Sequence, residues 1–302
     1  MENQALLESE ERGNPWVYVM FILLQSILYG FGNPVSKIAF ESISALWCLA
    51  ARFSLAFMLF VMLFGKRAYM QLKAANPKDY LPAGLSMAMA YITCNLALER
   101  TSATNVGFLM SLPVLIAPVL SSMLYKKPYK WLHLPVQIAV VGGLYLLCAN
   151  GAAFHLGAGD LLALCTALGA TGGLVFGEPA LKKLDAVVVS MVQLGITAII
   201  STILAFALDD VSTLGHVTPR SWAVVVYLAI GCSCIAYVLQ NLALQNMDSR
   251  VVSLMQCTQP VLTAVFAYIM LGEMLRPSGL FGAFIILAGI VAENVIPALR
   301  EG

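Results

Sequence analysis

The segment Ala90-Tyr-Ile-Thr-Cys-Asn-Leu-Ala-Leu98 has a counterpart in the second half of the chain, Ala236-Tyr-Val-Leu-Gln-Asn-Leu-Ala-Leu244. The two are identical at six of nine positions. Both are followed by Pro-Val-Leu, after 15 residues in the first half and after 16 in the second, and a glycine follows each proline by 29 residues. A single short match between apolar segments carries little weight, but three matches in register indicate an internal duplication.

The composition of the chain is typical of a protein surrounded by lipid. Of its 302 residues, 60% are hydrophobic and 11% are charged, and the mean hydropathy is +0.84. A soluble domain has about 25% charged residues, because its surface must face water. We therefore expect the lipid bilayer to be the solvent of this chain. The net charge of +1 offers no basic patch for a nucleic-acid partner.

Ten apolar stretches are long enough to cross a bilayer, whose hydrocarbon core of about 30 Å needs about 20 residues of helix. The loops between them are short, the longest being 65–79 and 209–220, so no soluble domain fits there. We predict an all-α integral membrane protein with an N-terminal tail over 1–15, a first repeat over 16–149 and a second over 160–297. The predicted spans are 16–36, 44–65, 80–98, 103–125, 131–149, 160–181, 186–208, 221–245, 251–271 and 278–297.

The basic residues of the loops set the expected orientation, because segments rich in Lys and Arg stay in the cytoplasm. With the N-terminus inside, the cytoplasmic segments hold twelve basic residues and the outer segments hold four, while Arg52 lies within a span. We therefore predict a multi-pass protein of the plasma membrane with both termini in the cytoplasm.

An odd number of spans in each repeat has a geometric consequence. After five crossings the second copy begins on the opposite side of the membrane, so the two five-helix repeats are expected to be inverted. Inverted repeats place a binding site near the midplane, at their interface, and permit alternating access by rocking. The sequence thus predicts ten transmembrane helices, as two inverted repeats, around a central cavity.

Polar side chains recur three and four residues apart in several spans, which places them on shared helix faces. Amides and phenols would supply a cavity with donors and acceptors that carry no fixed charge. The alternative is hydrogen bonding between helices, which contributes only about 0.6 kcal/mol per bond in membranes. Because the rows come from both halves, we expect a substrate cavity. The predicted substrate-binding residues are Gln25, Tyr29, Asn33, Arg52, Tyr91, Asn95, Thr171, Tyr237, Gln240, Asn241, Gln256 and Gln259.

Charged residues and prolines inside spans are further candidates. Arg52 should face protein or water, because a central Arg costs about 2.5–3.5 kcal/mol on insertion scales; it is expected either to bind an anionic group of the substrate or to tie helices together. Glu178 and Glu293 are candidates for coupling to protons. Proline frees a carbonyl and bends a helix. The candidate hinges or kinks are Pro34, Pro113, Pro179 and Pro260.

No signature of an enzyme is found in the sequence. The HExxH, GxSxG, GxxxxGKS and GxGxxG motifs are absent, and the three histidines are far apart. The seven cysteines all fall in apolar stretches and include no CxxC pair, which is typical of small packing residues. We therefore predict no catalytic residues, no metal site and no cofactor.

Several segments of the chain resemble the EamA-like transporters of the drug/metabolite transporter superfamily. The resemblance covers about residues 16–297 and implies a ten-helix inverted-repeat fold with a central cavity. It also implies transport, most often export, of metabolites such as amino acids. The segments that carry it are Tyr29-Gly-Phe-Gly-Asn-Pro-Val-Ser-Lys37, Ala51-Arg-Phe53, Asn95-Leu-Ala-Leu98, Thr101-Ser-Ala103 before Pro113, and Leu271-Gly-Glu273 before Gly282 and Gly289.

The sequence therefore predicts a secondary-active exporter of small organic metabolites that works by alternating access. Its expected partners are a small-molecule substrate, the lipid bilayer and protons, and it is expected to be a monomer or a homodimer. One alternative is an importer or exchanger of sugar-like or nucleotide-like solutes. An alternative from another class is a membrane scaffold or sensor, which would have a filled core instead of a wet pocket.

Overall fold

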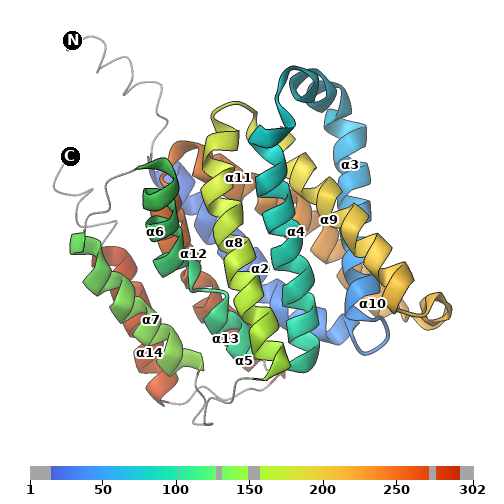
Figure 1. The fold of residues 1–302 in the computed structure, drawn as a ribbon. Helices are drawn as coiled ribbons and strands as arrows, with labels where there is room; N and C mark the ends of the chain where they lie inside the picture. The colour runs from blue at the N-terminus through green and yellow to red at the C-terminus, as the bar shows by residue number, and fades with distance from the viewer. Residues whose placement is uncertain (1–14, 102, 127–130, 149–156, 272–276, 293–302) are drawn as a thin grey trace.

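The computed structural model describes residues 15–101, 103–126, 131–148, 157–271 and 277–292. All regular structure in these ranges is helical. Figure 1 shows the helices gathered into one bundle. In chain order the helices are α2 (Pro15–Ala39), α3 (Ala45–Ala74), α4 (Pro77–Arg100), α5 (Ala103–Leu109), α6 (Pro113–Tyr125), α7 (Leu134–Cys148), α8 (Ala158–Leu181), α9 (Ala186–Leu208), α10 (Pro219–Tyr227), the π-helix η3 (Leu228–Ile235), α11 (Ala236–Asn246), α12 (Ser249–Gln256), α13 (Thr258–Leu271) and α14 (Pro277–Ile290), with short 3-10 turns η1 (Trp131–His133) and η2 (Val211–His216).

Eight helical stretches of the described chain are long and apolar enough to cross a membrane, and they coincide with eight of the ten predicted spans. The other two predicted spans, 131–149 and 278–297, correspond to shorter apolar helices, Leu134–Leu147 and Pro277–Ile290. These two helices, α7 and α14, pack against each other at one edge of the bundle (Figure 1). The chain is a multi-pass helical membrane protein.

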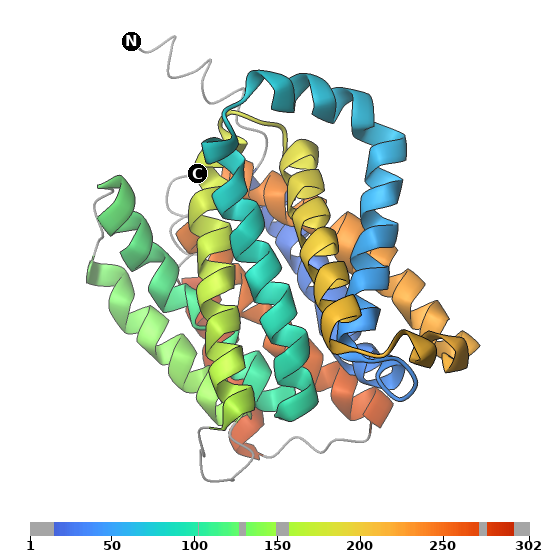
Figure 2. The same ribbon diagram turned by 45° about the vertical axis from the view of Figure 1, so that its right-hand side comes forward.

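The loop predicted over 65–79 is mostly helix, because α3 continues beyond its apolar stretch as far as Ala74. This extension is rich in Lys, Arg, Met, Gln and Leu, which favour helix even where no apolar face is buried. It lies across one end of the bundle (Figure 2). The chain turns at Asn76, whose side chain accepts a hydrogen bond from the backbone of Lys78 at 3.0 Å and caps α4.

Small residues let the helices approach closely, as is usual where lipid removes the hydrophobic drive for association. The helix α4 packs along α8, and α3 packs along α9. A Cβ atom placed on Gly169 of α8 would lie 2.6 Å from the backbone nitrogen of Ala90 in α4. A Cβ on Gly143 of α7 would lie 2.8 Å from the carbonyl oxygen of Gly282 in α14. Glycine is therefore required at both crossings.

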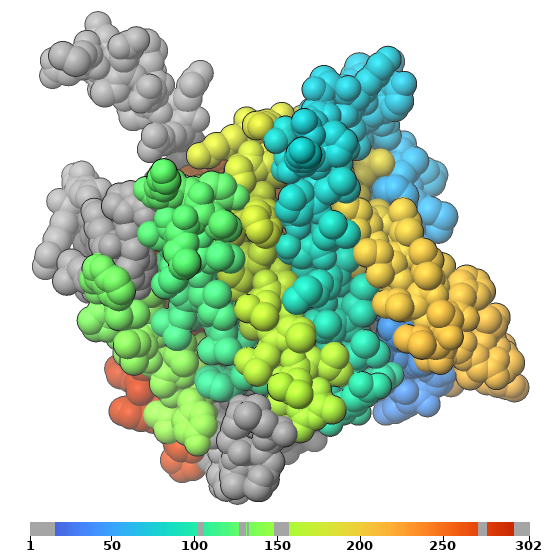
Figure 3. All heavy atoms as spheres, viewed as in Figure 1, coloured from blue at the N-terminus to red at the C-terminus, as the bar shows by residue number. Residues whose placement is uncertain are grey.

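Large apolar side chains cover the outside of the bundle. On the face drawn in Figure 3, α8, α4 and α9 lie side by side. Exposed apolar patches of this extent are rare on soluble monomers, and in a membrane they contact lipid tails. Exposed residues of these three helices include Leu85, Met89, Leu161, Leu168, Ile199, Ile203 and Phe206.

A polar cluster joins the two halves at the end of the bundle where α3 finishes. The Nε of Arg67 donates to Asp185 Oδ2 at 2.7 Å, and Gln71 Nε2 donates to the same oxygen. The backbone nitrogen of Asp185 donates to Gln71 Oε1 at 3.0 Å. Lys183 Nζ lies 2.9 Å from Asp79 Oδ1. We call these five residues the Asp185 cluster; it connects α3 and α4 with the turn between α8 and α9.

A second polar cluster joins the halves at the other end of α3, about 35 Å away along the helix at 1.5 Å per residue. Ser44 Oγ donates to Asp209, and Ser42 Oγ donates to Ser221 Oγ at 2.7 Å. We call Ser42, Ser44, Asp209 and Ser221 the Asp209 cluster. Both ends of the bundle are therefore tied between the first and second halves in this conformation.

Replacing Gly169 with alanine should destabilise the fold by about 1–3 kcal/mol, because the new methyl group overpacks the α4–α8 crossing against backbone atoms. The matched control is Gly65→Ala in α3, where the nearest atom is Val61 Cγ1 at 3.6 Å. That change should be neutral or stabilising by up to about 1 kcal/mol, because alanine favours helix over glycine. Thermal unfolding of the purified protein in detergent measures both. Equal melting temperatures for the two variants would contradict the close approach.

Asp185→Asn should show a pH-dependent loss of stability. The hydrogen bond from Gln71 and the guanidinium of Arg67 lower the pKa of the Asp185 carboxyl below its usual value. A carboxyl with a lowered pKa stabilises the folded state above about pH 3.9, the unfolded value, and this contribution is lost as the pH falls through the folded value. At pH 7 the variant should be less stable by under about 1 kcal/mol, because the pair is exposed.

Thermal unfolding at pH 7 and pH 3 measures this difference, which should shrink at the lower pH. In the double variant with Arg67→Gln, the two losses at pH 7 should be less than additive. A deficit for Asp185→Asn that stays constant between the two pH values would contradict a role for the ionised carboxylate.

Candidate functional site

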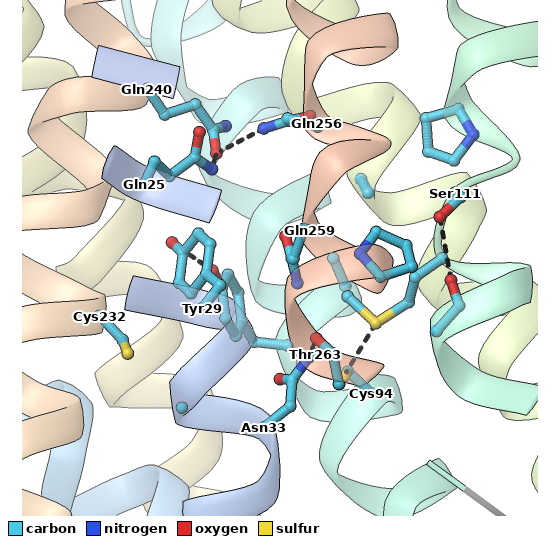
Figure 4. A pocket seen from close by; sticks show the side chains of 18 of the residues that line it. Gln25, Tyr29, Asn33, Cys94, Ser111, Cys232, Gln240, Gln256, Gln259 and Thr263 are labelled. Atoms are coloured by element: carbon cyan, nitrogen blue, oxygen red, sulfur yellow. Dashed lines mark hydrogen bonds between the residues drawn. The ribbon is translucent and has the colours of Figure 1, made fainter. Parts of the chain in front are cut away.

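A cavity lies inside the bundle, between helices of the first and second halves (Figure 4). Its volume is about 120 Å³, and an engineered protein cavity of about 150 Å³ holds a benzene ring. The space thus suits a small organic solute or several waters. Nine of the twelve predicted substrate-binding residues line it, namely Gln25, Tyr29, Asn33, Arg52, Tyr91, Asn95, Gln240, Gln256 and Gln259.

Three amides meet at one end of the cavity (Figure 4). Gln240 Oε1 accepts hydrogen bonds from Gln25 Nε2 at 2.8 Å and from Gln256 Nε2 at 3.1 Å. These side chains come from α11, α2 and α12, so the cluster joins the two halves. The carbonyl oxygen of Gln25 is buried and accepts no hydrogen bond from the described protein. The hydrogen-bonding capacity of this oxygen is therefore unused in this conformation.

The rest of the lining is amphipathic. Asn33 Nδ2 donates to Thr263 Oγ1 at 3.3 Å, which joins α2 to α13, and Gln259 lies nearby (Figure 4). The wall formed by α4 and the α5–α6 segment is less polar. There the Sγ of Cys94 lies 3.4 Å from the Sδ of Met110. Polar groups on one side and sulfur and carbon on the other suit a solute with one polar and one apolar end.

Arg52 of α3 lines the cavity and is 6% exposed. Its Nε donates to Ser233 Oγ of the π-helix η3 at 2.7 Å. Its Cζ lies 5.1 Å from the ring centre of Phe53 and 5.4 Å from that of Tyr91. Within the described ranges no carboxylate pairs with it, and its Nη2 is buried without a hydrogen-bond partner. A full positive charge is therefore enclosed beside the cavity without a counter-ion.

Three tyrosines stand next to Arg52. The hydroxyl of Tyr91 donates to the hydroxyl of Tyr29 at 2.7 Å. The rings of Tyr91 and Tyr237 are stacked, with centres 5.5 Å apart and planes at 28°. Tyr237 is 1% exposed and does not line the cavity. It supports Tyr91 from behind, whereas the sequence places it in the cavity wall.

Two further predicted cavity residues also lie elsewhere. Thr171 Oγ1 donates to the carbonyl of Ala167, one turn back in α8. Asn241 Nδ2 donates to Ser190 Oγ and to Gln193 Oε1 of α9, both at 2.8 Å. A helix inside a bundle has protein on several sides, so polar residues of one helix can face different neighbours. Gln240 faces the cavity, and Asn241, about 100° further round the helix, faces α9.

The predicted kinks fall into two kinds. Pro113 and Pro260 line the cavity, and each lies at a break in its span. The fourth span divides into α5 and α6, and the ninth divides into α12 and α13. Pro34 and Pro179 lie inside the continuous helices α2 and α8. Discontinuous helices at a midplane cavity are a recurring feature of transporter binding sites.

Of the two acidic candidates, only Glu178 lies within the described residues. Glu178 is 8% exposed, lies near the end of α8 and does not line the cavity. Glu293 lies outside the described residues. No group of three potential metal-ligating side chains gathers anywhere in the described ranges.

Several residues of the wall were not predicted from the sequence. Ser36 and Thr263 line it and continue the rows of Asn33 and Gln259 at spacings of three and four, so extending those rows would have found them. Cys232 also lines it, but it belongs to the wider turns of η3, where helical spacing does not apply. Met110 lies in the break after α5, which no sequence pattern indicated.

The geometry defines a polytopic membrane protein with an amphipathic central cavity. The chain belongs to the EamA-like transporter family, whose model matches residues 16–149 and 157–293. An uncharacterized transporter of Archaeoglobus fulgidus is 26% identical over 275 residues, covering 91% of this chain and 84% of the relative. The uncharacterized transporter YwfM of Bacillus subtilis is 23% identical over 304 residues, covering 96% and 97%.

A solved crystal structure that shares the fold is similar to this chain over most of its length. It superimposes with a TM-score of 0.77 at 16% identity and covers 94% of this chain and 99% of its own. At that identity the likeness concerns the fold alone. The family match and the two relatives identify the protein as a transporter.

Asn241→Leu should destabilise the protein by about 1–2 kcal/mol, because it leaves the buried oxygen of Gln193 without its donor. The matched comparison is the repeat-related Asn95→Leu. Within the described residues, Asn95 bonds only to the carbonyl of Tyr91 in its own helix, at 2.8 Å, so its loss should cost under about 0.5 kcal/mol on the scale of membrane hydrogen bonds. Thermal unfolding measures both. A larger loss for Asn95→Leu would contradict these assignments.

Proposed function

We propose that the protein is a secondary-active carrier that exports small organic metabolites, such as amino acids, by alternating access between two inverted five-helix repeats. The observation that carries this proposal is the cavity between the halves, lined by amides, tyrosines and Arg52. A scaffold or sensor, the alternative from another class, has no need of a cavity with a polar wall between the halves. Gln25, Gln240 and Arg52 are residues of this wall.

Two features support the inverted repeat. Tyr91 and Tyr237 occupy matching positions of the repeat, and their rings stack on each other, as expected if a pseudo-twofold axis passes between them. The packing is also reciprocal: α4 packs on α8, and α11, the counterpart of α4, packs on α2, the counterpart of α8. The pairs α3–α9 and α7–α14 join counterparts directly. With a pseudo-twofold axis in the membrane plane, the two repeats can exchange their conformations. This exchange turns a cavity open to one side of the membrane into a cavity open to the other side.

The two polar clusters are suited to act as gates. Each of them bridges the first and second halves, one at each end of α3. Opening the cavity toward one side would break the cluster on that side while the other holds. We assign the Asp185 cluster to the cytoplasmic side and the Asp209 cluster to the outside, because the loops on the side of the Asp185 cluster hold the excess of basic residues. This assignment places both termini in the cytoplasm and the protein in the plasma membrane.

Export is the direction favoured for this carrier, with protons as the candidate coupling ion through Glu178 or Glu293. The alternative substrates, nucleotide-like solutes, carry several negative charges. They would require more cationic groups than Arg52, which is the one cationic residue of the described cavity wall. Membership of a transporter family favours a role in transport over a catalytic role.

Gln256→Leu and Gln259→Leu should each reduce solute flux about fivefold to 150-fold, because a lost hydrogen bond to a polar solute inside the protein costs about 1–3 kcal/mol. The matched control is Asn246→Leu at the exposed end of α11; among the residues that the structure describes, the Asn246 side chain bonds only to the carbonyl of Leu242 in its own helix. It should transport like the wild type. Flux is measured in proteoliposomes, with and without a pH gradient, against a panel of amino acids and sugars.

Wild-type vesicles that pass no solute of the panel above the leak of empty vesicles would contradict the carrier proposal. Equal flux in both glutamine variants and in the wild type would remove these amides from the site. Acceleration by a pH gradient would support coupling to protons, and its absence would argue against it.

A further inference from the structure

We propose that Arg52 is the receptor for a carboxylate group of the transported solute, so that the substrates of this carrier are small carboxylic acids. This inference rests on the proposed carrier function. It deepens that proposal by assigning the solute's acid group to the end of the cavity where Arg52 and the tyrosines lie.

The enclosed charge of Arg52 is the first step of the argument. Arg52 lies seven residues after the start of α3, about 10 Å along the helix. A guanidinium is always charged at physiological pH, and its burial within a membrane protein is costly without compensation. The flanking rings of Phe53 and Tyr91 supply a cation–π contribution of about 0.5–2 kcal/mol. They are not a counter-ion, so the charge balance of the site is incomplete.

The unused hydrogen-bond donors are the second step. Guanidinium has five N–H donors, and within the described protein only the Nε of Arg52 has a hydrogen-bond acceptor, Ser233. The hydroxyl of Tyr29 accepts from Tyr91, so its own hydrogen remains available for another acceptor. Tyr29 and Arg52 both contact Tyr91 and both line the cavity. A guanidinium and a phenol are the donors that the two oxygens of a carboxylate require.

The charge of the site selects among anions. No other Lys, Arg or His contributes to the described cavity wall. One guanidinium neutralises one carboxylate, whereas a phosphate monoester carries about −1.5 to −2 charges and would bring an unpaired negative charge into the bundle. The volume of about 120 Å³ also favours a solute with a skeleton near six carbons, comparable to benzene.

The test uses matched acid and amide pairs on one skeleton: L-leucine with L-leucinamide, and 4-methylpentanoate with 4-methylpentanamide. Binding to the full chain in nanodiscs is measured by calorimetry. Each acid should bind the wild type at least about tenfold more tightly than its amide, the ratio expected for a charged hydrogen bond. Arg52→Gln should bring both ratios close to one, mainly by weakening the acid.

Three further variants separate a binding role from a structural one. Arg52→Lys keeps the charge but loses the planar fork, so it should retain part of the preference for acids. Tyr29→Phe removes one donor hydroxyl and should weaken acid binding about threefold to tenfold with little effect on amides. The matched control is Arg220→Gln, which removes an exposed arginine at the start of α10, and it should bind like the wild type.

Equal binding of acids and amides to the wild type, no binding of either acid, or an undiminished preference in Arg52→Gln would each overturn the proposal. The last result would mean that water alone solvates the guanidinium. Flux of the same four solutes in proteoliposomes separates this inference from the carrier proposal. Flux without preference for acids would support the carrier proposal and contradict the proposed role of Arg52. Arg52-dependent binding without any flux would support the anion site and contradict the carrier proposal.

Discussion

Hydrocarbon neither donates nor accepts hydrogen bonds, and this constraint shapes every part of the chain. The backbone must satisfy itself within helices, and each polar side chain in a span must find its partners inside the protein. Asn241 meets this demand through its Nδ2, which donates to Ser190 and Gln193 of a neighbouring helix, while its Oδ1 has no partner in the described protein. Gln25 and Arg52 likewise keep one polar atom each without a partner in the described residues. What separates them is their place: Gln25 and Arg52 line the cavity, whereas Asn241 holds α11 against α9.

The same constraint explains where the helices are irregular. The break between α5 and α6, the break between α12 and α13, and the π-helix η3 all border the cavity. Non-helical backbone is tolerated at membrane depth where it lines a cavity or is covered by protein. At the first break the backbone nitrogen of Met110 still donates to Val106 at 2.8 Å, so the interruption leaves this group satisfied. Wider turns at η3 bring Ser233 to Arg52 and Cys232 to the cavity wall.

The helices are held together by two kinds of contact, which differ in how easily they can be broken. Gly169 permits backbone contact between α4 and α8, and Gly143 does the same between α7 and α14, so these crossings tolerate little change. The Asp185 and Asp209 clusters are made of side chains at the ends of the bundle, where water can replace each broken contact at low cost. Under the alternating access proposed above, the close crossings would stay packed while the contacts at the ends exchange.

The sequence by itself determined the membrane class, eight of the spans and the existence of a repeat, because apolar length and register are local properties of the chain. It also indicated most of the polar residues of the cavity wall, since Gln25, Asn33 and Gln240 lie in rows at helical spacing. Only the tertiary structure decided that Asn241 faces α9, that Tyr237 supports Tyr91 from behind, and that Arg52 has no counter-ion in the described protein. These outcomes depend on which neighbour each helix face meets, and helical spacing fixes only the direction of a side chain around its own axis.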